Sequence, residues 1–329
     1  MRARPLAAVL AVLVAGCLPE IPQKNPHLLE PPPPPGGIRD LPHTFALGLI
    51  TGREAGSVTM RVFNTGTIRT RGEAVSALKS YHAKIELDVP VFLIRHSAQG
   101  LVLFGTGLSS DAGRRPRSVL DAVRPYAFRY KQKKGRDIVS RLRAGGTAPE
   151  DIRWVVVPNL EPDSAGMVDA FPAATVVVSR REWEWRKARV SGGAPPDPLS
   201  PASLEGRLRL RLVDLANSPA FGTFENGMDL FGDGSLYLVS LPGRSPGNMG
   251  LWANLDGGPV LLTGGVAYVV DNYLDLALPV KERIQDLEEY WRSLHIIRAS
   301  ARGVPRLVVF PGNDLTPLSL SGRSDIPLD

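Results

Sequence analysis

The sequence predicts a layered α/β domain, and two patterns carry the prediction. Short apolar runs rich in β-branched residues recur between turn signals, which is typical of buried strands. Stretches with helical spacing lie between some of these runs. Near residues 280–300 an apolar residue recurs every three or four positions, which places one apolar face on a helix: Ile284, Leu287, Trp291 and Leu294. Runs of strands with helices between them indicate sheets covered by helices.

The expected elements follow in chain order from the same two patterns. Strands are expected at residues 57–63, 89–94, 101–104, 154–157, 175–178, 208–213, 235–241, 249–253, 260–262 and 306–310. Beside the helix near 280–300, shorter helices are expected at 136–143 and 180–190. Residues 192–202 contain four prolines and are expected to form a surface loop.

The composition excludes several classes of protein. The chain has 329 residues, of which 43% are hydrophobic and 22% charged, and its formal net charge is +6. These values exclude a polytopic membrane protein, a collagen and a wholly disordered chain. With five His and one Cys, the chain cannot form an internal disulfide or a zinc or iron–sulfur site built on cysteines.

Residues 1–16 have the pattern of a secretory signal peptide. Two arginines precede an apolar run over residues 6–15, which has the length of a signal-peptide core and is too short to span a bilayer. The run ends in Val-Ala-Gly-Cys, which resembles a bacterial lipobox. The resemblance implies cleavage before Cys17, a diacylglyceryl group on its sulfur, and a lipid-anchored protein of the bacterial cell envelope. The membrane is then a partner, and the domain lies on the outer membrane facing the periplasm or at the cell surface. The alternative is an ordinary cleaved signal followed by an incidental Cys.

Residues 17–42 are expected to form the lipidated N-terminus and a proline-rich linker. Five consecutive prolines, residues 31–35, favour extended polyproline II, which spans roughly 3 Å per residue and leaves no room for a packed core. We expect a plain spacer between lipid and domain. A single folded domain is expected over residues 43–329, beginning close to Leu41.

Residues 154–172 read WVVVPNLEPDSAGMVDAFP and carry the most specific signal. The segment resembles the signature of metallo-β-lactamase-fold hydrolases, in which a strand runs into THxHxDHxGG and a short helix ends near Phe-Pro. Further segments match that family in the same order: FGTG at 104–107, LPGRSPGN at 241–248, LTGG at 262–265 and PGND at 311–314. Residues 60–69 and 89–107 look most like the acyl-homoserine lactonase branch. The resemblance covers about residues 45–315 and implies a four-layered αββα sandwich.

The same resemblance implies that the family's metal site is lost. In active relatives five His and two Asp bind two metal ions, usually zinc, whose bridging hydroxide attacks an ester or amide carbonyl. Carried over position by position, these ligands become Asn159, Glu161, Asp163, Ser164, Arg244, Gly265 and Asn313. Only Asp163 is retained, and none of the five His matches a ligand position: His27, His43, His82, His96 and His295. We therefore expect no zinc and no other cofactor.

Arg244 is expected to replace the metal electrostatically and to pair with Asp163, Glu161 or both. The alternative is an oxygen-rich site for Mg²⁺, Mn²⁺ or Ca²⁺ built from Glu161, Asp163, Asn159 and Asn313. Arg244 argues against it, because a permanent cation within a few ångströms of a dication costs several kcal/mol even at an effective dielectric constant of about 20.

Other catalytic arrangements are incomplete in this sequence. Ser164 follows Asp163, but neither matched turn supplies a His to act as base. Glu161 and Asp163 suit acid–base catalysis if their pKa values are pushed apart, and equally suit two partners for one arginine. Tyr268 matches a tyrosine that lactonase-like members place near the substrate carbonyl. Without a metal beside it, a role in the core or the pocket wall is the alternative.

Residues 114–143 form a basic segment with eleven Lys or Arg and two Asp. Signal cleavage lowers the formal charge of the chain to +4, of which this segment supplies +9, so the remainder of the mature chain is mildly acidic. The segment is either a solvated helical face or a contact surface for anionic lipid, lipopolysaccharide or an acidic partner. Nucleic acid is excluded as a partner, because it is scarce outside the cytoplasm and no aromatic stacking platform is interleaved with the charge.

The sequence thus predicts a lipid-anchored, non-catalytic binding or interaction protein of the cell envelope. The residues expected to line its cleft are Asn159, Glu161, Asp163, Ser164, Arg244, Tyr268 and Asn313. One alternative is a diverged metallo-hydrolase, lactonase- or esterase-like, with an atypical oxygen-ligand metal site or metal-independent carboxylate chemistry. A further alternative is a structural lipoprotein whose cleft is closed by salt bridges.

Overall fold

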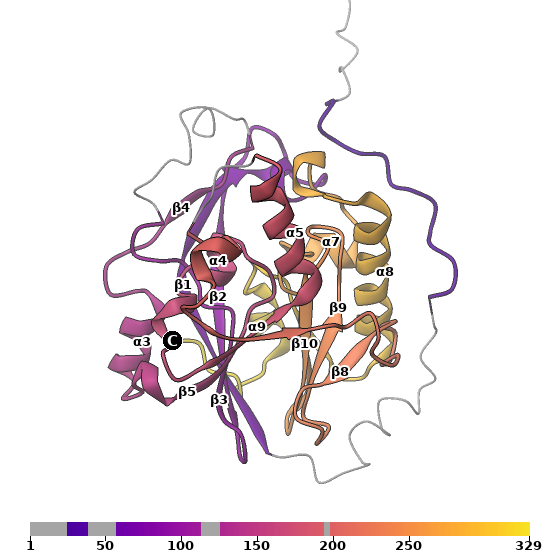
Figure 1. Cartoon of the computed structure of the whole chain (residues 1–329). Coiled ribbons are helices and arrows are strands. Elements are labelled where there is room, and N and C mark those ends of the chain that lie inside the picture. The colour runs from indigo at the N-terminus through magenta and orange to yellow at the C-terminus, as the bar shows by residue number, and fades with distance from the viewer. Residues whose placement is uncertain (1–24, 39–56, 113–125, 194–197) are drawn as a thin grey trace, which may run out of the picture.

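Two β-sheets lie face to face in the chain, which a computed structural model describes over residues 25–38, 57–112, 126–193 and 198–329 (Figure 1). The expected signal peptide, Cys17, His43 and residues 114–125 of the basic segment lie outside the described residues. Among the described residues, no helix combines the length and the apolar character needed to cross a lipid bilayer.

The strands of the described residues are divided between a larger and a smaller sheet. The larger sheet has the order β4 (Arg129–Lys131), β1 (Val58–Arg71), β2 (Lys84–His96), β3 (Gly100–Phe104), β5 (Ile152–Val156), β6 (Thr175–Ser179) and β7 (Arg209–Val213). The smaller sheet has the order β12 (Val308–Phe310), β11 (Gly258–Leu262), β10 (Met249–Leu255), β9 (Leu236–Ser240) and β8 (Gly227–Asp229). Strands β3, β5, β6 and β7 are parallel, so the loops after β3 and β5 leave the same edge of the sheet.

The inner strands are apolar throughout because each of their faces is buried in a different core. In β5, Val156 points into the core between the sheets, while its neighbour Val155 packs against helices. In β11, Leu262 lies between the sheets and Leu261 packs against the helix of the other outer layer. Because side chains alternate along a strand, a layered fold needs such continuous apolar runs, and the runs in the sequence predicted these strands.

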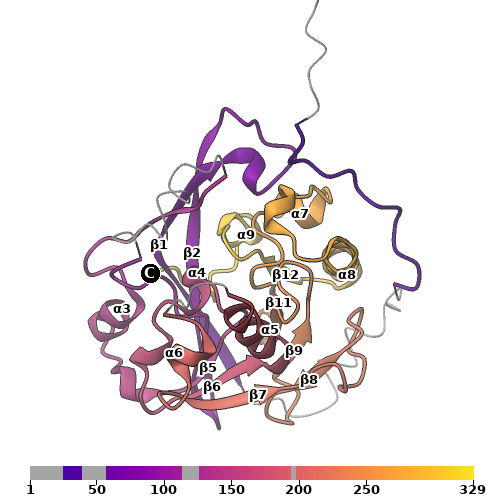
Figure 2. The same cartoon turned by 45° about the horizontal axis from the view of Figure 1, so that its top comes forward.

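Helices cover the outer face of each sheet, as Figures 1 and 2 show. The larger sheet is covered by α3 (Ile138–Ala144), α4 (Pro162–Ala165), α5 (Arg180–Ser191) and α6 (Pro201–Leu204). The smaller sheet is covered by α7 (Val270–Leu274) and α8 (Leu287–Gly303), and α9 (Thr316–Ser321) follows β12. Short 3-10 helices lie at Gly72–Ala74, Pro149–Asp151, Val168–Ala170 and Lys281–Arg283. The predicted αββα sandwich is confirmed.

The predicted elements are present, with differences at their boundaries. Strands β1 and β2 extend well beyond the apolar runs that predicted them, because one side of each extension is polar. Strands β4 and β8 have three residues each and were not predicted. The long helix begins at Leu287 and not near 280, because Asp286 accepts a hydrogen bond from the backbone N of Glu289 and caps it. Ile284 therefore lies before the helix.

Residues 25–38 lie against the folded body, which differs from the expectation of a plain spacer and a domain that begins near Leu41. This segment runs along the outside of α8 in Figure 1. The indole N–H of Trp291 donates to the carbonyl of Pro33 at 3.2 Å, and Arg292 donates to the carbonyl of Gly36 at 3.0 Å. Leu29 packs on the core beneath α8. Proline lacks an N–H group but keeps its carbonyl, so a polyproline segment can accept hydrogen bonds from a helix.

The start of α8 fixes the turn that carries Arg244. The backbone N–H groups of Gln285 and Asp286 both donate to the carbonyl of Gly243, at 2.8 and 3.0 Å. Gly243 has φ +119°, and a Cβ there would lie 2.2 Å from backbone atoms of Tyr290. Only glycine fits this approach of the turn to the helix.

Replacing Gly243 with Ala is expected to lower the free energy of unfolding by about 3 kcal/mol or more, because backbone strain and a clash with α8 add. Urea denaturation followed by circular dichroism measures the change. Gly206→Ala is the matched control, since Gly206 also has positive φ but no atom within 4 Å of an added Cβ. The control is expected to cost about 1 kcal/mol. Equal losses in the two variants would contradict the packing argument.

Candidate functional site

The loops that carry the altered ligand positions meet at one edge of the sandwich. The loop after β5 contributes Asn159 to Ser164, the turn between β9 and β10 contributes Arg244, and the loops after β11 and β12 contribute Gly265 and Asn313. Backbone hydrogen bonds join the two sheets here, including one from Met249 N to the carbonyl of Pro158 at 3.0 Å. The structure thus brings together residues that are far apart in the sequence.

Asn248 is the centre of the hydrogen-bond network in this cleft. Its amide nitrogen donates to the carbonyls of Leu241 and Thr263, at 2.9 and 3.2 Å. Its amide oxygen accepts from Asn159 Nδ2 at 3.0 Å and from Gly265 N at 2.9 Å. Asn248 is 1% exposed, and the network uses two donors and two acceptor positions of one amide. It ties three loops together without any charged group.

The side chain of Arg244 fills the space above Gly265. A Cβ at position 265 would lie 2.8 Å from both Cδ and Nε of Arg244, and 2.7 Å from Nδ2 of Asn159. Contacts below 3.0 Å force a neighbour to move, so a side chain at 265 and this placement of Arg244 exclude each other. The glycine at 265 and the arginine at 244 are therefore one structural unit.

Glu161 lies between two buried arginines. Its carboxylate oxygens lie 3.9 Å from a terminal nitrogen of Arg244 and 3.7 Å from a terminal nitrogen of Arg186. Both arginine side chains are more than nine-tenths buried, at 8% and 9% exposure. The predicted pairing of Arg244 thus holds for Glu161. For Asp163 it does not, because Asp163 instead accepts a hydrogen bond from Asn313 Nδ2 at 3.1 Å.

Two side chains of helix α5 position the loop that carries Glu161. Glu182 and Arg186 are one helical turn apart and hold the backbone of one residue: Leu160 N donates to Glu182 at 3.1 Å, and Arg186 donates to the carbonyl of Leu160 at 2.8 Å. Burial raises the pKa of the Glu182 carboxyl above its usual range. The i, i+4 pair therefore fixes the loop through backbone contacts.

Aromatic rings separate Arg244 from a second buried arginine, Arg283. The guanidinium carbon of Arg244 lies 4.8 Å from the ring centroid of Tyr268, and that of Arg283 lies 3.5 Å from the centroid of Phe128. The two rings meet edge to face at 5.6 Å. Burial, with a further contribution from Arg244, lowers the pKa of Arg283 to about 10. Burial and the nearby carboxylates raise the pKa of Tyr130. A cation–aromatic stack occupies the cleft.

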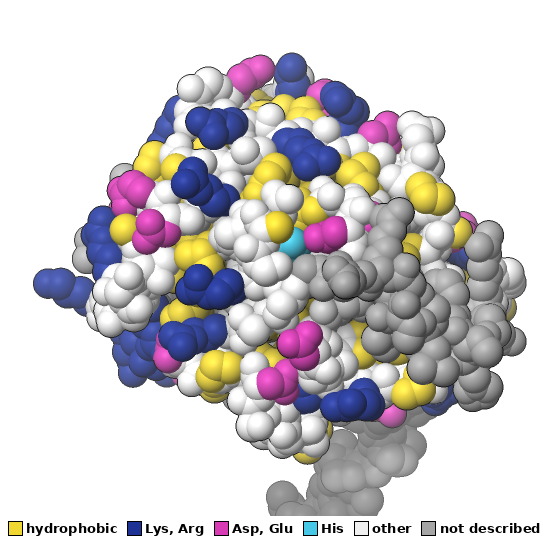
Figure 3. All heavy atoms as spheres, turned by 90° about the horizontal axis from the view of Figure 1, so that it is seen from below, with side chains coloured by type: hydrophobic (Ala, Val, Ile, Leu, Met, Phe, Trp, Pro, Cys, Tyr) yellow, Lys and Arg dark blue, Asp and Glu magenta, His cyan; other side chains and the backbone are white. Residues whose placement is uncertain are grey.

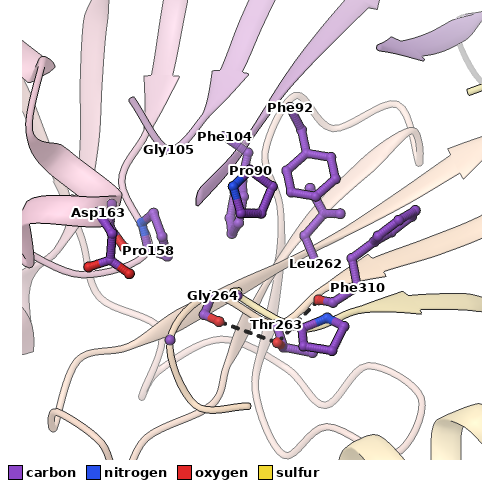
Figure 4. A pocket seen from close by; sticks show the side chains of 14 residues that line it. Pro90, Phe92, Phe104, Gly105, Pro158, Asp163, Leu262, Thr263, Gly264 and Phe310 are labelled. Atoms are coloured by element: carbon purple, nitrogen blue, oxygen red, sulfur yellow. Dashed lines mark hydrogen bonds between the residues drawn. The ribbon is translucent and has the colours of Figure 1, made fainter. Parts of the chain in front are cut away.

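A small cavity lies next to Gly265. This cavity of about 20 Å³ lies under the cleft between Phe92, Phe104, Phe310 and the loop of Gly264 (Figure 4). This is room for about one water molecule. The carboxylate of Asp163 lines the cavity, and its Oδ1 is buried with no hydrogen-bond partner among the described residues. The cavity does not accommodate a substrate-sized molecule.

The remaining predicted residues have structural contacts. Ser164 contributes its carbonyl, which accepts from the N and Oγ1 of Thr106 at 2.8 and 3.3 Å. Tyr268 is fully buried under Arg244, and its hydroxyl has no partner among the described residues. His96 lies at the other end of β2, where its ring bonds Asp233 at 2.7 Å.

Sequence reasoning missed four residues that shape the cleft. Asn248 ends the quoted LPGRSPGN segment, where the matched turn of the family has its second His, so a signal was present. Glu182 and Arg186 could also have been found from the sequence, because opposite charges at i, i+4 on an expected helix indicate a paired face. Arg283 left no signal, because the short helix Lys281–Arg283 has no pattern that relates it to the motifs.

The side chains of the cleft do not fit a pair of zinc ions. Zinc is bound by imidazole, thiolate or carboxylate groups. Here Asn159 turns its amide nitrogen to Asn248, and the buried cation of Arg244 stands over the position of the former bridging carboxylate. Among the described residues, no three His, Cys, Asp or Glu side chains are close enough to hold a metal ion.

Known proteins similar to this chain are lactonases and related hydrolases. The N-acyl homoserine lactonase AttM of Rhizobium radiobacter is 28% identical over 229 residues, which is 68% of this chain and 81% of AttM. The metallo-hydrolase mfmC of Annulohypoxylon moriforme is 26% identical over 230 residues, 66% of this chain and 54% of mfmC. No protein-family model matches the chain.

Solved structures show the same fold. An N-acyl homoserine lactone hydrolase with N-hexanoyl-L-homoserine at its catalytic metal centre has a TM-score of 0.64 and 18% identity, covering 81% of this chain and 96% of that chain. The dizinc quorum-quenching lactonase AidC has a TM-score of 0.54 and 15% identity, covering 80% and 90%.

The layers, the topology and these matches define a protein of the metallo-β-lactamase fold. Among known proteins, the chain is similar in sequence to the lactonase AttM.

Replacing Gly265 with Ala is expected to lower the free energy of unfolding by about 1–3 kcal/mol, because the new methyl group overlaps Arg244 and Asn159. In an Arg244→Ala background this penalty is expected to shrink by about 1 kcal/mol or more, which a double-mutant cycle with urea denaturation measures.

The control cycle combines Gly265→Ala with Arg186→Ala. Arg186 also pairs with Glu161, but it is not among the atoms nearest to position 265. Its coupling energy to Gly265 is expected to be close to zero. Additive losses in the Arg244 cycle, with no difference from the control cycle, would contradict the view of Gly265 and Arg244 as one unit.

Proposed function

We propose that this protein is a non-catalytic member of the metallo-β-lactamase fold that serves as a lipid-anchored interaction protein of the bacterial cell envelope. One observation carries the proposal: Arg244 packs on Gly265 in the cleft and pairs with Glu161. A guanidinium in this position supplies a fixed positive charge where active relatives use metal ions. Unlike a metal ion, a guanidinium does not coordinate a water molecule and lower its pKa. It also stays protonated, so it cannot act as a base toward water.

The filled cleft supports interaction through another surface. Arg244 and Arg283 stack on Tyr268 and Phe128, and the cavity lined by Asp163 and Gly265 beside them has a volume of about 20 Å³. Small-molecule sites are commonly clefts of several hundred Å³, so the described residues of this cleft favour closure by ion pairs and stacking over ligand binding.

A diverged hydrolase is the second candidate, and two observations favour it. AttM is a lactonase and mfmC a metallo-hydrolase. In addition, Asp163 keeps one buried carboxylate oxygen that has no partner among the described residues and faces a cavity with room for about one water. A retained reaction would then use Asp163 with an oxygen-ligand metal ion or as a base.

The anchor and the location are proposed from the sequence. Cys17 is the single Cys of the chain and falls at the position that a lipobox requires. Lipidation there would place the domain on the outer membrane facing the periplasm or at the cell surface. Residues 114–143 would contribute affinity for anionic lipid or for an acidic partner.

Purified protein expressed with added zinc and then dialysed is expected to hold far less than one metal ion per chain, because Arg244 repels a dication at this site. Mass spectrometry of the elements measures the content. Hydrolysis of an N-acyl homoserine lactone is expected to stay at background, with AttM assayed in parallel as the active control. Near-stoichiometric metal that is lost in Asp163→Ala, together with lactone hydrolysis, would establish the hydrolase instead.

Replacing Cys17 with Ala is expected to abolish incorporation of an alkyne-tagged fatty acid and to lower the share of protein in the membrane fraction. Gel fluorescence after coupling a dye to the alkyne, and fractionation, measure the two effects. The control carries Ala98→Cys in the Cys17→Ala background, which restores the number of cysteines but not their position. Acylation of the control, or an unchanged membrane share in Cys17→Ala, contradicts the proposed anchor.

A further inference from the structure

One end of the molecule is formed by residues 71–84, 126–134 and 270–281, which we call the tether end. It is the upper end in Figure 1, and it comes forward in Figure 2. The segments are bonded to one another: Ala77 N donates to the carbonyl of Leu278 at 2.8 Å, and Asn272 Nδ2 donates to that of Val75 at 2.7 Å. The tether end is thus a continuous surface.

The tether end exposes large apolar side chains. Leu78 is 66% exposed and Leu274 is 48% exposed, and they account for two of the four exposed large hydrophobic side chains among the described residues. The segments that carry them are joined by Lys79 and Asp271, whose charged groups lie 2.9 Å apart. A single exposed leucine is ordinary, but leucines on one end together with basic residues are typical of surfaces that enter a membrane interface.

Basic side chains surround these leucines. Lys84 and Lys281 are exposed on this end, and the described part of the basic segment adds further exposed residues: Arg129, Lys131, Lys133 and Lys134. Strand β4 places this segment beside the end of β1, where the backbone of Arg129 lies opposite that of Arg69 in the antiparallel sheet. The nearby acidic groups are fewer: Glu282 lies 2.5 Å from His27, Glu73 accepts a hydrogen bond from Asn25 at 2.6 Å, and Asp271 pairs with Lys79, while Asp275 beside Leu274 is exposed. The end is therefore complementary to an anionic surface.

The chain toward Cys17 leaves the body at this same end. Asn25 Nδ2 donates to Glu73 and, at 2.7 Å, to the hydroxyl of Tyr126, so residue 25 is fixed to the tether end. His27 adds a backbone bond, since its carbonyl accepts from Lys281 N at 2.9 Å. Seven residues separate Cys17 from Asn25, and their greatest span is about 28 Å.

We infer that the tether end docks on an anionic lipid surface, with Leu78 and Leu274 entering the interface and the surrounding lysines contacting headgroups. The claim that this end is held at a membrane rests on the proposed lipidation of Cys17. The exposure of the leucines and lysines is observed in the structure. A lipid on Cys17 and a span of about 28 Å keep this end at the bilayer, and its charge then favours contact.

The described side chains on the opposite end are of mixed kinds. Seen from below in Figure 3, it carries Lys and Arg interspersed with Asp and Glu. The turn between β2 and β3 lies there, and it includes the exposed Ala98. Strand β2 joins the two ends, so Ala83 at its start and Ala98 beyond its end are about 45–50 Å apart. These two alanines provide a matched pair of probe positions.

The experiment uses the lipidated, full mature chain in vesicles of phosphatidylcholine with phosphatidylglycerol. Acylation blocks the thiol of Cys17, so Ala83→Cys or Ala98→Cys supplies the single free thiol for a fluorescent label. Nitroxide lipids then quench a label that lies at the bilayer. We expect strong quenching at position 83 and little at 98, and we expect the quenching at 83 to fall when Leu78 and Leu274 are both replaced by Ser. Leu328→Ser, at a leucine that is 52% exposed beside β1, is the control.

Charge is tested on the same strand. Lys84→Gln is expected to weaken docking about five-fold, whereas Arg95→Gln, near the other end of β2, is expected to leave it unchanged. Neutral vesicles or 1 M salt are expected to reduce the quenching at 83, because salt screens the headgroup charge.

Equal quenching at 83 and 98, or stronger quenching at 98, overturns the docking surface, and so does quenching at 83 that is indifferent to lipid charge. A free, labelled Cys17 instead shows that the anchor proposal has failed. The two failures are therefore told apart by which thiol takes the label.

Discussion

The buried cation of Arg244 is the constraint on which the arrangement of the cleft depends. A guanidinium that is 8% exposed needs a carboxylate, and Glu161 supplies it while also meeting Arg186. The arginine needs space, and Gly265 supplies it by having no side chain. It also needs a polarisable surface, which the ring of Tyr268 offers. The uncharged network around Asn248 then holds the surrounding loops together. A carboxylate side chain at position 265 is therefore not needed to hold them.

At the same end of the sandwich, residues 25–29 are linked to the arginine stack. Residues 25–29 hold the turn of Arg283 from outside, because His27 bonds both Lys281 N and Glu282. Arg283 in turn donates to the carbonyl of Tyr126, whose hydroxyl receives Asn25. The proline-rich segment and the arginine stack are thus linked through hydrogen bonds. A displacement of residues 25–29 would therefore first affect the side of the cleft that contains Arg283.

Much of the fold could be predicted from the sequence, and the reason is physical. Strands such as β5 and β11 are buried on both faces, so their apolar runs are continuous and visible. Strand β4 could not be predicted, since three residues with charged neighbours carry no periodic signal. The docking of residues 25–38 was also invisible, because proline carbonyls accept from Trp291 and Arg292 without any apolar pattern. In the cleft, motif order located Arg244 and Gly265, but only the three-dimensional structure brings Arg283 beside them.

The retention of Asp163 follows from loop geometry more simply than from catalysis. Asn313 Nδ2 donates both to Asp163 Oδ2 and to the backbone carbonyl of Asp88, and so joins α4, β2 and the loop after β12. Asp88 in turn receives the backbone N of Leu315 at 3.2 Å. Burial raises the pKa of Asp88, and its hydrogen bonds to Leu315 and Asn64 oppose the shift. Burying this carboxylate costs free energy, and the hydrogen bonds that offset the cost also order the loop. A carboxylate at 163 that accepts from Asn313 does the same for α4. Asp163 therefore has a structural use that does not require a metal.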